Sequence, residues 1–254
     1  MCTTFKFCAL AAAFATALPL QAATTVTLRP DGTGTANGDA LVTTGPSNNL
    51  TGNNYGGAGA ITVSAPGMPQ GEQRSILRFD ISTATASFNS TYGVGGWTVT
   101  GAQLELTAAA PNNGIFNANA AGSFLIQWTP NDSWTEGTGN PNTPSGTGVK
   151  WTDIATLATG AESEGTQNYN GALGTVDYTL APSAGLLSDI TAGGPVSFIL
   201  STTDPAMSGL FDSRSFGTAS ARPALILTAS AIPEPGRAAL LWLAGLGVAW
   251  RRRK

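Results

Sequence analysis

The chain has 254 residues, with 32 glycines, 15 prolines and only 11% charged residues, a composition that disfavours long helices and favours strands and turns. It contains no histidine, which excludes histidine general bases, Ser-His-Asp triads and histidine-ligated zinc or iron. Between Ala23 and Ala231 there are six Lys or Arg and 14 Asp or Glu, a net charge of −8. This charge argues against nucleic acid as a partner and disfavours anionic polysaccharides.

Residues 1–22 have the pattern of a secretory signal. Lys6 supplies a short positive region, the run Phe7–Leu18 is apolar, and small residues follow at Ala22 and Ala23. An uncleaved anchor helix is the alternative, but this run is short for a membrane span, which needs roughly 20 residues. We therefore expect export and cleavage by signal peptidase, and both cysteines of the chain would leave with the signal.

The first loop after the signal, Asp31–Asp39, combines acidic residues with glycines (DGTGTANGD). Carboxylate and backbone oxygens of such a loop could ligate a structural calcium ion. The ligand order of an EF-hand and its terminal glutamate are absent, so the sequence favours an ordinary turn. No other cofactor is predicted.

Residues 23–231 are predicted to form one all-β domain. Strand-like runs recur without a fixed repeat, and stretches rich in Gly, Asn, Pro and Thr separate them. In Ala102–Leu106 and Val196–Leu200, apolar residues alternate so that they share one face. The expected strands are Thr24–Arg29, Ala60–Ser64, Arg74–Ile81, Thr98–Thr107, Ser123–Trp128, Val149–Asp153, Thr175–Leu180, Val196–Ser201 and Ala224–Thr228.

Roughly nine strands with long connections predict a two-sheet, jelly-roll-like β-sandwich rather than a closed barrel. We expect an N-terminal signal helix and a C-terminal hydrophobic helix to flank it. The stretch Gly137–Gly148 consists mostly of turn-forming residues and is expected to be an exposed loop.

Tryptophans in the second half of the body are candidate sugar contacts, because an exposed indole can stack on the C–H face of a sugar ring. Trp134 is the best candidate for exposure, since Asn131-Asp132-Ser133 precede it and a loop follows. For any one of these tryptophans the sequence nevertheless favours packing, in the core or, for Trp134 and Trp151, across one end of the sandwich.

Charged residues complete the candidate site. Arg78 and Asp80 are two residues apart on one strand face, and Arg214 could join them, since arginine forks match carboxylates. The predicted ligand-binding set is Trp134, Trp151, Glu136, Arg78 and Arg214.

A catalytic role for nearby carboxylates is the competing hypothesis. A glycosidase needs two carboxylates roughly 5–10 Å apart across a cleft. Asp132, Glu136 and Asp153 lie near the Trp134 motif, but their spacing does not favour this role over that of solvated loop charges. No catalytic residue is assigned, and we predict that the protein is not an enzyme.

The C-terminal segment has three features in order. They are the tripeptide Pro233-Glu234-Pro235, the apolar stretch Ala238–Trp250, and a cluster of cations, Arg251, Arg252, Arg253 and Lys254. Thirteen apolar residues in a helix reach about 20 Å, short of the roughly 30 Å hydrocarbon core. The terminal cations would keep this end in the cytoplasm.

This order of features resembles the PEP-CTERM sorting tail of Gram-negative bacteria. The resemblance implies recognition and removal of the tail by an exosortase, an integral-membrane enzyme, and a link to exopolysaccharide or biofilm matrix. Arg237 departs from the pattern, since it places a charge before the apolar stretch. A plain single-pass anchor is the alternative to a transient sorting anchor.

The body carries a second, weaker resemblance, to the DNRLRE domain. This family comprises extracellular β-sandwiches related to disaggregatase-associated and carbohydrate-binding modules. Ser215-Phe216 and Lys150 depart from its pattern. The ordered motifs that carry the resemblance are Asp39–Val42 with Asn54–Gly57, Ser75–Ser82, Val99–Leu106, Trp134–Gly137 with Val149–Trp151, and Phe211–Arg214 with Arg222–Leu225.

Together these features predict a non-catalytic exported surface or matrix protein that binds polysaccharide. A structural matrix protein without a defined ligand and a polysaccharide-degrading enzyme are the alternatives. The expected partners are signal peptidase, an exosortase and an exopolysaccharide, with membrane contact only through the C-terminal helix before processing. The tail resemblance implies a tethered intermediate at the inner membrane, followed by the cell surface or extracellular matrix.

Overall fold

The computed structural model describes residues 22–30, 36–111 and 119–233. The predicted signal up to residue 21 and the sorting tail from Glu234 onward lie outside the described residues. The same holds for the start of the proposed calcium loop, residues 31–35.

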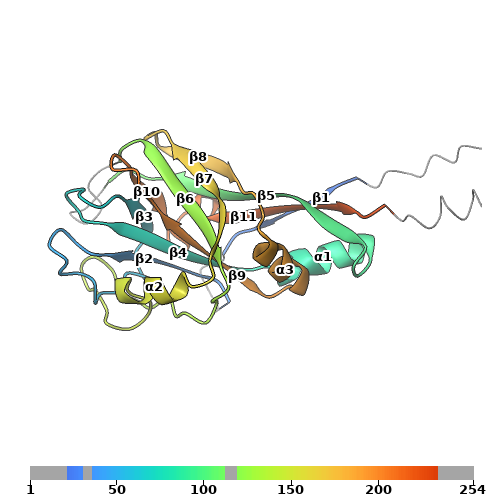
Figure 1. The fold of residues 1–254 in the computed structure, drawn as a ribbon, viewed down its shortest axis with the longest axis horizontal. Helices are drawn as coiled ribbons and strands as arrows, with labels where there is room; N and C mark the ends of the chain where they lie inside the picture. The colour runs from blue at the N-terminus through green and yellow to red at the C-terminus, as the bar shows by residue number, and fades with distance from the viewer. Residues whose placement is uncertain (1–21, 31–35, 112–118, 234–254) are drawn as a thin grey trace, which may run out of the picture.

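The described residues form eleven strands, three helices and two short 3-10 turns (Figure 1). The strands are β1 (Thr24–Leu28), β2 (Gly38–Thr43), β3 (Ala60–Ser64), β4 (Gln73–Asp80), β5 (Trp97–Ala108), β6 (Gly122–Thr129), β7 (Glu162–Tyr169), β8 (Gly174–Thr179), β9 (Pro195–Ser201), β10 (Ser208–Asp212) and β11 (Ala224–Ala231). The helices are α1 (Ser82–Tyr92), α2 (Ile154–Leu157) and α3 (Ala184–Ala192), and the 3-10 turns are η1 (Trp151–Asp153) and η2 (Ala219–Ala221).

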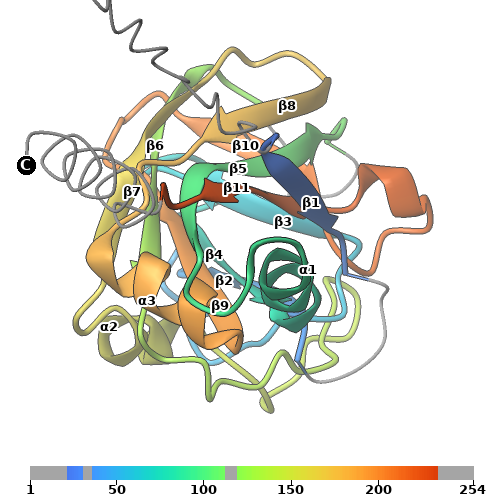
Figure 2. The ribbon, with the colours of Figure 1, turned by 90° about the vertical axis from the view of Figure 1, so that its right-hand side faces the viewer.

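All strand pairs are antiparallel, in the order β1-β11-β5-β10-β3-β4-β9-β6-β7, with β2 added beside β4 and β8 beside β5. Only one residue pair joins β10 to β5 and one joins β3 to β4, so the sheet bends at these places. Figure 2 shows β1, β5 and β11 on one side of the molecule and β2, β4 and β9 on the other. The chain is therefore an all-β sandwich.

The main core lies between these two layers. Phe124 of β6 contacts Tyr178 of β8, with ring centroids 5.0 Å apart, although the two strands are not paired. From β4 and β9, Leu77, Phe79 and Phe198 point into the same core and are at most 1% exposed. This burial is the main hydrophobic contribution to stability.

A second apolar cluster covers the outer face of β2, β4 and β9. Val42, Ile76 and Ile199 from these strands pack under Val149 and Leu157. The covering layer is the segment between β6 and β7, which includes α2 and lies below β2 and β4 in Figure 1. These three strands are thus buried on both faces.

Eight of the nine predicted strands are confirmed, within one to three residues at their ends. The ninth, Val149–Asp153, is wrong, because η1 and α2 occupy this part of the chain. The Asp153 carboxylate accepts a hydrogen bond from the backbone N–H of Lys150, which caps this helical turn.

Three strands and all three helices were not predicted. β7 is polar (ESEGTQNY), and β2 and β10 are short. Helix α1 (STATASFNSTY) is rich in Ser and Thr, which have low helix propensity. Tertiary packing stabilises it, since Ala84, Thr85 and Phe88 are buried.

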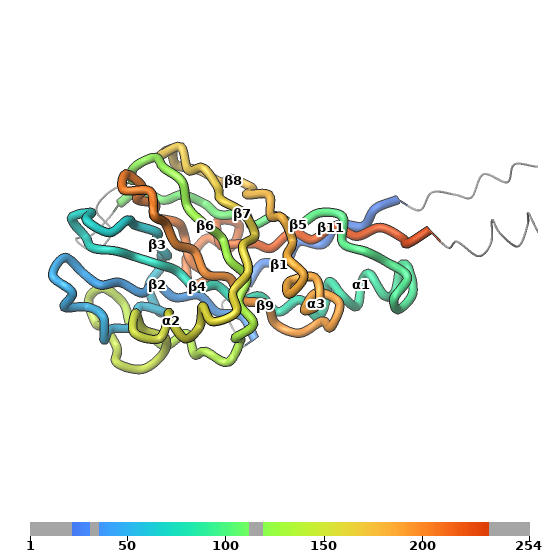
Figure 3. The backbone as a smooth tube through the Cα atoms, in the orientation of Figure 1, coloured from blue at the N-terminus to red at the C-terminus, as the bar shows by residue number. Residues whose placement is uncertain are grey.

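Both ends of the described body lie at one pole of the molecule. Thr24 at the start of β1 pairs with Ala229 near the end of β11. Ile232 donates a backbone hydrogen bond to the carbonyl of Gly96, which fixes the last residues beside the turn before β5. In the tube of Figure 3 this pole is on the right and α2 is at the opposite end.

Across the three ranges that the structure covers, no helix is both long and apolar enough to cross a membrane.

Candidate functional site

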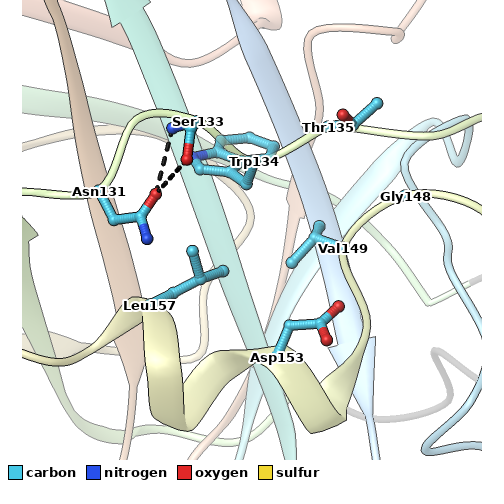
Figure 4. A pocket seen from close by; sticks show the side chains of 8 residues that line it. All are labelled: Asn131, Ser133, Trp134, Thr135, Gly148, Val149, Asp153 and Leu157. Carbon is cyan, nitrogen blue, oxygen red and sulfur yellow. Dashed lines mark hydrogen bonds between the residues drawn. The ribbon is translucent and has the colours of Figure 1, made fainter.

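A depression of about 300 Å³ opens on the layer that covers the outer face of the sheet (Figure 4). The segment after β6 forms one wall, and η1 with α2 forms the other. The side chain of Asn131 accepts hydrogen bonds from the N–H and the hydroxyl of Ser133, which shapes the first wall. The lining residues are Asn131, Ser133, Trp134, Thr135, Gly148, Val149, Asp153 and Leu157.

Trp134 is the buried floor of this region. It is only 6% exposed, so the packing role that the sequence favoured is the one observed, and Trp134 is not an exposed platform for a sugar ring. Its Nε1–H donates to the hydroxyl of Ser197 at 3.0 Å, and the Arg78 guanidinium lies 4.6 Å from the ring centroid. A Cβ at Gly38 would lie 3.1 Å from the ring, a tight contact, so glycine eases the close approach of β2 to Trp134.

Arg78 is a buried cation that anchors the loop by its backbone. Its Nη1 donates to the carbonyls of Asp132 and Trp134 at 2.6 and 2.7 Å, and its Nε to the carbonyl of Ala36 at 3.3 Å. The side chain is on β4, and the residue is 7% exposed. Burial lowers its pKa, and the nearby carboxylates of Asp132 and Glu136 oppose that effect.

Glu136 and Arg214 form a bidentate ion pair that joins two distant loops. Glu136 also accepts a hydrogen bond from the backbone N–H of Asp39, 3.0 Å away on β2. The N–H of Arg214 in turn donates to the Asp39 carboxylate. These contacts hold the segment after β6, the segment after β10 and the edge strand β2 in one arrangement.

Asp39 is the most perturbed carboxyl group of this cluster. It is 2% exposed, and its Oδ1 has no hydrogen-bond partner. Burial raises the pKa of Asp39 to about 8, against the opposing effect of the Arg214 N–H. The side chain therefore binds a proton at neutral pH.

Asn54 is a site-organising residue that the sequence analysis did not single out. It is fully buried, and its Nδ2 donates to the carbonyls of Glu136 and Val149 at 2.6 and 2.7 Å. Its Oδ1 accepts from the N–H groups of Gly56 and Gly139 at 3.1 and 3.3 Å. The signal in the sequence was an amide directly before Tyr-Gly-Gly, within one of the motifs that carry the DNRLRE resemblance.

The glycines around Asn54 are required by close backbone contact. A Cβ at Gly56 would lie 2.0 Å from the carbonyl oxygen of Glu136, and one at Gly139 would lie 1.9 Å from that of Asn54. The predicted exposed loop Gly137–Gly148 is therefore anchored at both ends by Asn54, through residues 136, 139 and 149.

Four of the five predicted site residues lie in one cluster, namely Arg78, Trp134, Glu136 and Arg214. Trp151 is not among them. It is partly exposed and packs against the apolar cluster under α2. The Arg74 guanidinium lies over its ring, 5.1 Å from the ring centroid.

Of the predicted grouping of Arg78, Asp80 and Arg214, the two arginines lie in this cluster and Asp80 does not. Arg214 pairs with Glu136, as described above. The Asp80 carboxylate instead accepts from the N–H of Ser82 at the start of α1.

The site offers hydroxyl, amide and carboxylate groups around an apolar floor. Within the described ranges, no three or more Cys, Asp or Glu side chains are placed to share a metal ion. Glu136 is held by Arg214, and Asp39 is buried under the same loops. Such an arrangement can accept and donate hydrogen bonds to a hydroxyl-rich ligand.

The chain was compared with models of known protein families, and none of them matches. No curated protein matches it either.

Proposed function

We propose that the protein is a non-catalytic, exported surface or matrix module that binds polysaccharide. The observation that carries this proposal is the depression of Figure 4, where polar groups of Asn131, Ser133, Thr135 and Asp153 surround an apolar floor. Concave sites with an apolar floor and a few fixed polar groups are typical of small-molecule and sugar binding.

The position of the chain ends supports the same proposal. Ile232, the residue before the predicted sorting tripeptide, donates a backbone hydrogen bond to the carbonyl of Gly96. A module attached through this pole presents α2 away from the attachment point (Figure 1). We propose a sandwich of jelly-roll type related to DNRLRE domains, sorted through its tail by an exosortase.

Direct binding to immobilised polysaccharides tests this function. We expect the full chain, in a detergent without a sugar headgroup, to be retained on at least one member of a panel of neutral, amine-bearing and anionic polysaccharides. Asn131→Ala should weaken retention by about tenfold, since it removes a lining amide and the contact that orients Ser133.

A matched control is available on another face. Asn170 also accepts a hydrogen bond from a backbone N–H two residues later, that of Ala172, at 2.9 Å. Asn170→Ala removes the same kind of turn contact away from the depression, and should leave retention unchanged. If the chain is retained on none of the polysaccharides, the binding proposal is contradicted, and a structural matrix protein without a defined ligand is the better explanation.

Tail processing is tested separately by mass spectrometry of the protein recovered from its native cell envelope. We expect mature chains that lack the Arg251–Lys254 cluster. Mature chains that still end in this cluster would contradict removal by an exosortase. Turnover of any polysaccharide by the purified chain would overturn the proposal that the module is non-catalytic.

A further inference from the structure

Three depressions adjoin one another along the segment that follows β6. The depression of Figure 4 shares Asn131 and Ser133 with a second one of about 720 Å³. It shares Ser133, Trp134 and Thr135 with a third one of about 420 Å³. The three depressions therefore lie next to one another along residues 130–138, and we call this row, together with the α2 side chains that face it, the trough.

The walls of the trough are fixed by contacts already described. Arg78 donates hydrogen bonds to the carbonyls of Asp132 and Trp134, and Asn54 donates to those of Glu136 and Val149. A fixed row of depressions suits an extended chain of repeating units better than a single compact molecule. Rigid walls also reduce the ordering cost of binding.

The charge of the trough selects among polymers. Asp153 lines the first depression and Asp132 the second, and among the described residues neither depression is lined by a lysine or an arginine. The third contains Arg78 and Arg214, but these guanidinium groups are engaged with the loop carbonyls and with Glu136. An anionic polymer would therefore meet negative charge along most of the trough.

Asp132 is an incompletely satisfied carboxyl group of the second depression. Its Oδ1 is buried and has no hydrogen-bond partner in the structure. Burial raises the pKa of Asp132, a hydrogen bond with Ser197 lowers it, the carboxylate of Asp189 raises it, and the guanidinium of Arg78 lowers it. A second cationic group, bound in this depression, would further favour the ionised form of Asp132.

We propose that the trough binds an extended amino-sugar polymer that carries protonated amines, with its ammonium groups beside Asp132 and Asp153. This inference rests on the proposed polysaccharide-binding function and narrows its ligand class. Hydroxyl and amide groups of Asn131, Ser133 and Thr135 contact the sugar hydroxyls between the charged positions.

The test uses the full chain in a zwitterionic detergent, titrated by calorimetry with glucosamine oligomers from disaccharide to hexasaccharide. Fully N-acetylated oligomers of the same lengths and oligomers of an anionic uronate are the comparison probes. We expect the glucosamine hexasaccharide to bind at least about tenfold more tightly than the disaccharide, because it reaches more than one depression. We also expect it to bind more tightly than its N-acetylated and uronate counterparts.

A single variant separates charge from shape. Asp153→Asn keeps an oxygen that can accept the Lys150 N–H but removes the charge, and should weaken binding of the glucosamine hexasaccharide about fivefold. Binding of the N-acetylated hexasaccharide should not change. The matched control is Asp177→Asn, which removes an exposed charge from β8, on another face of the sandwich.

The outcomes distinguish this inference from the function on which it rests. Equal affinity for glucosamine and N-acetylated oligomers, or a preference for the uronate, would overturn the ligand class while polysaccharide binding stands. Equal affinity for disaccharide and hexasaccharide would contradict the inference that one oligomer occupies more than one depression of the trough. Failure of every oligomer and every polysaccharide to bind would remove both proposals together.

Discussion

The two faces of β4 are both buried, but by different kinds of interaction. On the inner face, Leu77 and Phe79 pack into the main core. On the outer face, Ile76 packs under the segment after β6, and Arg78 binds particular carbonyls of that segment. Apolar packing accepts many partners of suitable volume, whereas hydrogen bonds to two chosen carbonyls require one backbone path. The inner face therefore sets stability, and the outer face sets the shape of the surface that a ligand meets.

The largest effect is expected from the inner face. Phe198→Ala removes a fully buried ring that packs edge-on against Phe79, with centroids 6.2 Å apart. We expect the free energy of unfolding to fall by about 4 kcal/mol, since the change leaves a cavity in the core. Urea denaturation measures this value, and a loss below about 1 kcal/mol would contradict the assignment of this face as the main core.

A smaller but local effect is expected from the outer layer. Asn54→Ala leaves four buried backbone groups without partners, at Gly56, Glu136, Gly139 and Val149, and should cost about 3 kcal/mol. Amide hydrogen exchange should accelerate in residues 136–149 while β9 stays protected. Uniform acceleration across the sheet would show that the outer layer is not a separate unit. Asn170→Ala is the matched control, with an expected change within about 0.5 kcal/mol.

The pH dependence of stability isolates one group of the outer layer. The folded-state pKa of Asp39, about 8, lies above its ordinary value of 3.8. The folded protein therefore retains a proton that the unfolded chain releases. The resulting contribution of Asp39 to the free energy of unfolding is complete below the unfolded-state pKa, and it is lost as the pH rises toward the folded-state pKa. Between about pH 5 and about pH 7 the loss from Asp39 is about 3 kcal/mol.

Asp39→Asn removes this titration. Chemical denaturation at the two pH values should show a smaller decrease in stability for Asp39→Asn than for the unaltered chain. Asp177→Asn, on the exposed strand β8, should retain the full decrease. An identical decrease in Asp39→Asn and the unaltered chain would mean that Asp39 is already ionised near neutral pH.

The smallest effect is expected at Trp151, outside the cluster. Arg74→Met removes the cation 5.1 Å from the Trp151 ring centroid and the ion pair with Glu72, but keeps an apolar stem. Because the Arg74 side chain is 33% exposed, the expected loss is about 0.5 kcal/mol. Thermal unfolding measures this change, and a loss comparable to that of Asn54→Ala would place Trp151 within the organised layer.

Much of the inner face could be predicted from the sequence. Alternation in Ala102–Leu106 and Val196–Leu200 identified strands whose apolar side is buried. Such periodicity can be seen in a short stretch of sequence, because successive side chains of a strand point to opposite faces of the sheet. Helix α1 could not be predicted, because its Ser- and Thr-rich sequence becomes helical only through packing of Phe88 against the ring of Trp97, 5.0 Å away.

For the outer layer, the sequence predicted which residues form the cluster but not which partners they contact. Arg78, Trp134, Glu136 and Arg214 were chosen for their chemistry, and the fold does bring them together. Their exact partners depend on contacts between segments more than 50 residues apart in the chain, which no local pattern encodes. For the same reason, Trp134 was chosen as the best candidate for exposure among the tryptophans, whereas the guanidinium of Arg78 covers its ring.

The pairing of β11 has a mechanical consequence. This strand lies between β1 and β5, paired with β1 from Ala229 to Leu225 and with β5 over its whole length. A pull applied at Ile232 and resisted at the trough would run along the strand, at right angles to its hydrogen bonds. Both ladders would then be loaded together in shear and could not open one bond at a time. The arrangement suits a load-bearing link between the proposed tail anchor and the proposed polysaccharide ligand.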